Sequence, residues 1–131
     1  MWTKTGMIAA MEFPAGSEIC LHWSHSVTGG PVADCFEHHD GRLVLMRSYL
    51  HDFAAGLGEV PGRGRIEAAP EGGYWITDIA EIMPDNALAI RIGPERVGHV
   101  LEGQGQTLAL SQLAPDQRAH LRLTTPAPSN E

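Results

Sequence analysis

Turn-forming residues recur about every ten positions along this chain, and they constrain its fold more than any other feature. The sequence contains 15 Gly and 9 Pro. The apolar runs between the turns alternate with a period of two, as in Leu88, Ile90 and Ile92. Short strands at regular spacing with turn residues between them are typical of all-β sandwiches and barrels. We therefore predict an all-β fold, an antiparallel β-sandwich of about seven to nine strands with Greek-key or meander connections.

The length of 131 residues suits one domain with a core of its own. We predict a single β-sandwich domain over residues 1–123. The remaining stretch, 124–131, contains Pro126, Pro128, Ser129 and Asn130. Polar, Pro-containing termini of this kind rarely order. We therefore predict a disordered C-terminal tail.

The charge balance excludes some classes of partner. The formal net charge is −7, with 9 Lys and Arg against 16 Asp and Glu. Binding to a nucleic-acid backbone or to an anionic membrane surface needs clustered cations, so we expect neither. No apolar run reaches the length of about 20 residues that a membrane-spanning helix needs, which predicts no membrane insertion. The first eleven residues are too weakly apolar for an export signal, and the compartment stays open.

Two cysteines and seven histidines raise the question of a metal site. No set of three or four of these residues shows the spacing of a zinc site, so we predict no metal and no cofactor. We predict a strand from Glu18 to Val27, a turn at 28–31 and a second strand from Val32. In this register Cys20 and Cys35 lie about 13 Å apart along the sheet. A disulfide requires Cα atoms within about 7 Å, so we predict two free thiols.

The same register places His25 opposite Asp34. The next turn is the pair Asp40-Gly41, which favours a two-residue hairpin. That hairpin pairs Asp34 with Arg47. The inward face of the three strands is predicted to be apolar and to carry a polar row of His25, Asp34 and Arg47 at one end. The apolar residues predicted on this face are Leu21, Trp23, Phe36, Leu43 and Leu45.

This polar row is the candidate site, and three interpretations stay open. Arg47 or a protonated His25 can donate hydrogen bonds to an anion, with the Gly-rich loop around Gly56 as a rim that covers the ligand. The row can also act as a buried polar lock that holds strand register. A third interpretation is general-base catalysis by His25 with Asp34 as its orienting group. Ser26 follows His25 in the strand and should point to the opposite face, which argues against a nucleophile pair.

Three short motifs support a resemblance to a known family. They are His25-Ser26-Val27, then Pro31-Val32 with an acid at Asp34, and then Ala55-Gly56-Leu57. In this order the motifs resemble a small bacterial domain-of-unknown-function family that is often encoded beside TAXI-type TRAP transporters. The likeness spans about Ile19 to Leu123. It implies no assigned activity, but it implies an accessory role in the uptake of organic acids, usually after export to the periplasm.

The preferred functional hypothesis is therefore a non-enzymatic accessory or small-ligand-binding module linked to TRAP-type transport. Its expected partners are a small organic anion and a membrane transporter. Two alternatives remain: a small enzyme that uses the His25–Asp34 pair as a general base, and a structural interaction domain whose exposed edge strand recruits a partner.

Overall fold

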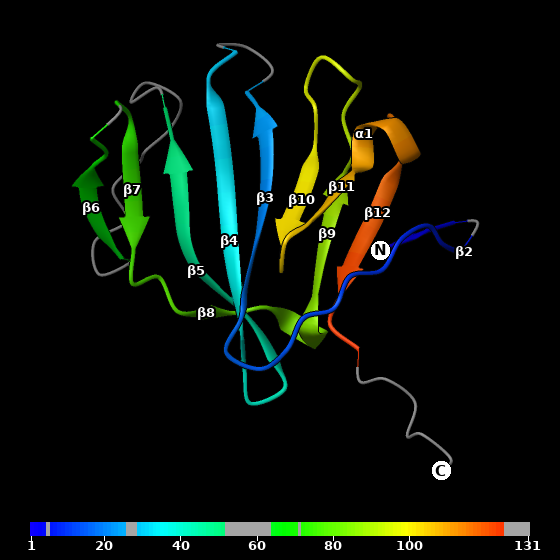
Figure 1. The fold of residues 1–131 in the computed structure, drawn as a ribbon, viewed down its shortest axis with the longest axis horizontal. Coiled ribbons are helices and arrows are strands. Elements are labelled where there is room, and N and C mark those ends of the chain that lie inside the picture. Colours follow the sequence, from blue (N-terminus) through cyan, green and yellow to red (C-terminus); the bar gives the residue numbers. More distant parts are fainter. Residues whose placement is uncertain (5, 26–28, 52–63, 71, 125–131) are drawn as a thin grey trace.

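The computed structural model describes residues 1–4, 6–25, 29–51, 64–70 and 72–124. Two antiparallel sheets contain the strands, with the order β2-β1-β12-β9 in the smaller sheet and β11-β10-β3-β4-β5-β7-β6 in the larger one, where β8 also pairs with β5. Figure 1 shows the larger sheet in this order, from β6 at one end to β10 and β11 at the other. The strands are β1 (Trp2–Thr3), β2 (Gly6–Met7), β3 (Glu18–Ser24), β4 (Pro31–His39), β5 (Arg42–Leu50), β6 (Arg65–Ala68), β7 (Tyr74–Thr77), β8 (Glu81–Ile82), β9 (Ala87–Arg91), β10 (Val100–Gly103), β11 (Gln106–Ala109) and β12 (Arg118–Arg122).

The predicted antiparallel β-sandwich is confirmed. The described residues hold twelve strands rather than seven to nine, because three of them, β1, β2 and β8, are only two residues long. Helical structure in this part of the chain is confined to the 3₁₀ turn Pro84–Asn86 and to α1 (Leu110–Leu113). None of the described helices is long and apolar enough to cross a membrane.

The core forms where the two sheets face each other. Leu21, Phe36 and Leu43 from the larger sheet are buried in one cluster with Ala119 and Leu121 of β12. Alternation within each strand sends these side chains inward and their neighbours outward. The other two residues predicted for this face, Trp23 and Leu45, pack against the same cluster. The prediction of which face turns toward the core is therefore confirmed.

The register of the first hairpin differs from the prediction by four residues. Cys20 lies opposite Cys35, and Leu21 rather than His25 lies opposite Asp34. The strand pairing closes at Ser24 and Pro31, so Pro31 begins β4 instead of ending the turn. Proline is tolerated as the first residue of a strand because that position need not donate to the ladder. A shift by an even number preserves the face of every side chain, which explains why the predicted core is right and the predicted neighbours are wrong.

The second hairpin begins as predicted and then departs from it. Asp40 and Gly41 have φ values of 52° and 78°, and the predicted pair Phe36–Leu45 is present. Between Phe36 and Cys35 the register shifts by one residue in a β-bulge, so Cys35 faces Arg47 and Asp34 faces Ser48. A bulge places two residues of one strand against one of its partner. Arg47 therefore points to the outer face of the larger sheet, and the predicted Asp34–Arg47 pair is wrong.

Some predicted features lie outside the described residues. These are Ser26, Gly56 and the predicted tail, apart from Thr124.

Candidate functional site

The predicted row of His25, Asp34 and Arg47 is not formed. His25 lies just beyond β3, where its backbone N–H donates to the Gly30 carbonyl at 2.8 Å and its carbonyl accepts from the Gly29 N–H at 2.9 Å. Asp34 lies opposite Leu21, four positions farther along the sheet, or about 13 Å at strand rise. Arg47 lies on the other face. A His25–Asp34 acid-base pair is therefore absent, and a binding role for each of these residues stays a prediction.

Asp34 has Ser48 as its partner instead. The Ser48 hydroxyl donates to Oδ1 of Asp34 at 2.6 Å, and the two residues face each other across β4 and β5. Burial raises the pKa of the Asp34 carboxyl, and the Ser48 hydrogen bond partly opposes that shift. Ser48 was not part of the predicted polar row, so this pair is a finding of the structure, and its role in holding strand register stays a prediction.

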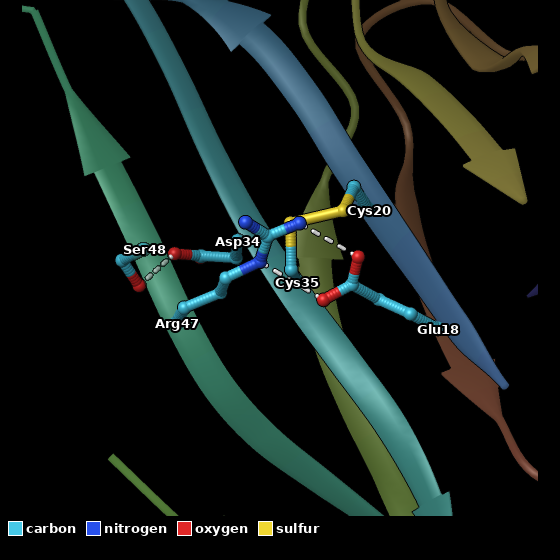
Figure 2. The surroundings of a disulfide bond; sticks show 6 residues. All are labelled: Glu18, Cys20, Asp34, Cys35, Arg47 and Ser48. Atoms are coloured by element: carbon cyan, nitrogen blue, oxygen red, sulfur yellow. Dashed lines mark hydrogen bonds and ion pairs between the residues drawn. A yellow bond between two sulfur atoms is a disulfide. The ribbon is translucent and has the colours of Figure 1, made fainter. Parts of the chain in front are cut away.

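Arg47 is held by Glu18 and Trp75 on the outer face. Its Nε donates to Glu18 Oε2 at 2.9 Å and its Nη2 donates to Oε1 at 2.7 Å. The guanidinium carbon also lies 4.4 Å from the centre of a Trp75 ring, which is within cation–π range. Figure 2 shows the forked pair of hydrogen bonds between the two side chains. The guanidinium is thus oriented both by a carboxylate and by an aromatic face.

The two cysteines form a disulfide, so the prediction of free thiols is wrong. Cys20 and Cys35 are directly opposite each other on β3 and β4, with Cα atoms 4.0 Å apart. Figure 2 shows the sulfur bridge linking the two strands beside Arg47 and Glu18. Cys35 is fully buried, whereas Cys20 is half-buried. Cys20, but not the buried Cys35, contributes to the lining of a pocket on this face.

The pocket has a volume of about 620 Å³. Ligand pockets in proteins commonly measure about 300–1,000 Å³. Arg47 and Trp75 form one end, and the β10–β11 hairpin, with Glu102 and Thr107, forms the other. Its lining combines one arginine, two carboxylates, an imidazole and an aromatic ring with the backbone of a glycine turn. The residues are Glu18, Cys20, His22, Arg47, Trp75, Glu102, Gly103, Gln104, Gly105 and Thr107.

The sequence predicted Arg47 as a site residue but not its neighbours Glu18 and Trp75. It also did not predict Ser48 as the partner of Asp34. One available signal was the pair of cysteines itself. Pairing Cys20 with Cys35 centres the hairpin between residues 27 and 28, which yields the observed register. The bulge in β5 has no comparable signal in the residues around it.

Comparison with known proteins identifies the family. The model of the domain of unknown function (DUF1850) matches residues 19–110, more than half of the chain. The chain belongs to this family. The match begins one residue after Glu18 and contains the rest of the pocket lining. No curated protein matches the chain, and no solved structure does. The family carries no assigned function, and its association with TRAP transporters is not part of the match.

Proposed function

We propose that this DUF1850 protein is a non-enzymatic module that binds a small organic acid in the outer-face pocket, as an accessory to TRAP-type transport. The observation that carries the ligand class is Arg47, whose guanidinium is already held in the pocket by a carboxylate of the protein itself. The planar fork of an arginine matches any carboxylate in the same two-bond geometry. The transport link is supported by the family resemblance alone.

A ligand can replace Glu18 at small energetic cost. The side chains of Glu18 and Arg47 are 33% and 39% exposed. Exposed ion pairs commonly contribute about 0–1 kcal/mol, and a forked arginine–carboxylate pair lies at the upper end of that range. Trp75 holds the guanidinium from its other side and so keeps it in place when the carboxylate is exchanged. Glu18 thus behaves as an internal competitor that occupies Arg47 while no ligand is bound.

The far end of the pocket narrows the class of acid. Glu102 lies on β10, three strands from Arg47 on β5, or about 14 Å between backbones. A second ligand carboxylate would be repelled there, whereas a hydroxyl or ammonium group would find an acceptor in Glu102. We therefore expect a ligand with one carboxylate at one end and a hydrogen-bond donor at the other.

The test uses the disulfide-bonded protein and isothermal titration calorimetry. Hydroxy and amino monocarboxylates are titrated beside dicarboxylates and the matching neutral amides. Arg47→Gln should abolish binding, and Glu18→Gln should strengthen it several-fold because the internal competitor is weakened. Arg42→Gln is the matched control, since Arg42 is on the same strand but outside the pocket lining.

Two results would contradict this function. One is equal binding of acids and their neutral amides, because the guanidinium would then play no part. The other is unchanged affinity in Arg47→Gln, which would place any ligand elsewhere on the molecule.

A further inference from the structure

Three potential metal-ligand atoms gather beside the pocket, which two of their residues, Glu18 and Cys20, help to line. A carboxylate oxygen of Glu18 and the sulfurs of Cys20 and Cys35 all lie within 4.8 Å of one another. The prediction of no metal site rested on sequence spacing, because neither cysteine stands in a zinc-ligand motif. The observed register brings the two sulfurs together without such a motif, and in the disulfide they are bonded to each other.

We propose that reduction of the Cys20–Cys35 disulfide creates a binding site for a thiophilic divalent cation, with Cys20, Cys35 and Glu18 as its protein ligands. Two thiolates and a carboxylate are among the ligands that Zn²⁺ prefers, and three protein ligands leave the fourth tetrahedral position to a water molecule from the open pocket. This site goes beyond the function proposed above, and its test needs no organic acid.

The reduction step has a defined direction. A dithiol reductant enters from the pocket, and its thiolate attacks the sulfur of Cys20, since Cys35 has no exposed surface. The Cys20–Cys35 bond breaks, and Cys35 leaves as a thiolate. The second thiol of the reductant then attacks the mixed disulfide, which releases Cys20 and oxidises the reductant to its cyclic disulfide. Binding of the divalent cation to the two thiols releases two protons.

Arg47 assists the reduction step. It faces Cys35 directly across β4 and β5, and a nearby guanidinium favours the thiolate form of a cysteine. Two sulfurs bound to one tetrahedral Zn²⁺ lie about 3.8 Å apart, as follows from Zn–S distances near 2.3 Å. Side-chain rotation of the two cysteines can supply that separation without moving the strands. Glu18 must turn from Arg47 to the metal, so metal binding and the Arg47–Glu18 ion pair exclude each other.

The experiment compares the reduced and oxidised forms of the whole chain without any organic acid present. The protein is reduced with dithiothreitol and desalted anaerobically, and a thiol assay verifies two free thiols per chain. Zn²⁺ affinity is measured by competition with a chromophoric chelator, and Co²⁺ reports thiolate ligation through its charge-transfer absorption. Glu18→Gln tests the carboxylate. Glu37→Gln is the matched control, because Glu37 faces Glu18 across the strand pair but pairs with His39.

We expect reduced protein to bind Zn²⁺ at least about a hundredfold more tightly than oxidised protein, and Glu18→Gln to weaken that affinity about tenfold or more. Glu37→Gln should change it less than twofold. Equal affinities of the two redox forms would overturn the site, and so would wild-type affinity in Glu18→Gln. Loss of β-structure on reduction, seen by circular dichroism, would also overturn it, because the three ligands converge only in the folded sheet. Failure here leaves the organic-acid test unaffected, since that test uses oxidised protein.

Discussion

The Ser48 hydroxyl donates a 2.6 Å hydrogen bond to Oδ1 of Asp34. The partner of this carboxylate is therefore a neutral hydroxyl rather than the predicted guanidinium of Arg47. A hydroxyl stabilises a buried carboxylate less than a paired cation does. The pKa of Asp34 is therefore raised, because the effect of burial exceeds the opposing effect of the Ser48 hydrogen bond.

Asp34→Asn should therefore stabilise the protein at neutral pH. Because the folded-state pKa of Asp34 is raised above 3.8, the folded state binds more protons than the unfolded state in the window above that value. Stability from this group is then lost as pH rises through the window. Asparagine does not ionise and still accepts the Ser48 hydrogen bond. We expect a gain of about 1 kcal/mol at pH 7 that shrinks toward pH 4 in urea unfolding. A gain that grows toward pH 4 would contradict this.

His99 should make stability depend on pH with the opposite sign. Its Nδ1 accepts a hydrogen bond from the Gly93 N–H at 2.9 Å, and burial lowers its pKa below 6.5. The unfolded state binds more protons just below pH 6.5, so stability rises with pH there and is fully present above 6.5. His99→Asn offers an oxygen acceptor that does not titrate. Urea unfolding at pH 5 and pH 7 should show a smaller loss in the variant, and an equal loss would assign the dependence to other groups.

Removal of the disulfide should cost about 3 kcal/mol. The two cysteines are 15 residues apart in sequence, and closing a loop of about that length lowers the entropy of the unfolded chain by about this amount. Chemical unfolding of Cys20→Ser/Cys35→Ser, compared with oxidised wild type, measures the loss. An unchanged midpoint would mean that the unfolded chain gains no freedom when the bridge is removed.

Gly103→Ala should destabilise the protein. An added Cβ would lie 2.6 Å from Cγ2 of Ile19 and 3.0 Å from the Glu18 carbonyl, and Ile19 is a buried core residue. Overpacking of this kind costs about 1–3 kcal/mol. Gly41→Ala would meet nothing within 4 Å, but the φ of 78° at Gly41 makes that variant a test of backbone strain rather than a neutral control. Thermal unfolding should show Gly103→Ala to be less stable than wild type, and an unchanged midpoint would contradict the close contact.

The fold was predictable from the sequence because it depends on period and turn chemistry. Alternation placed Leu21, Phe36 and Leu43 on the core face, and Asp40-Gly41 located a turn to the residue. These features are local, and they survive an even shift of register. Pairing between strands is less determined, since Pro31 can either end a turn or begin a strand, and here it begins β4.

The site was less predictable because it depends on which residues become neighbours. The disulfide and the Arg47–Glu18 pair each join strands through the register. A single error of four residues separated the cysteines and brought His25 to Asp34. The side of the sheet on which Arg47 lies also depends on the β-bulge, and no residue type in β5 indicates a bulge.

The extra residue in β5 reverses the parity of the strand part-way along its length. Up to Leu45, the odd-numbered residues of β5 face the core. Beyond Met46 the pattern is reversed, so Arg47 lies on the outer face. A relative shortened by one residue there would bury its arginine and leave the outer cavity without a cation, although every lining residue stayed the same. Alignments of this family therefore need to be scored for length at this point as carefully as for amino-acid identity.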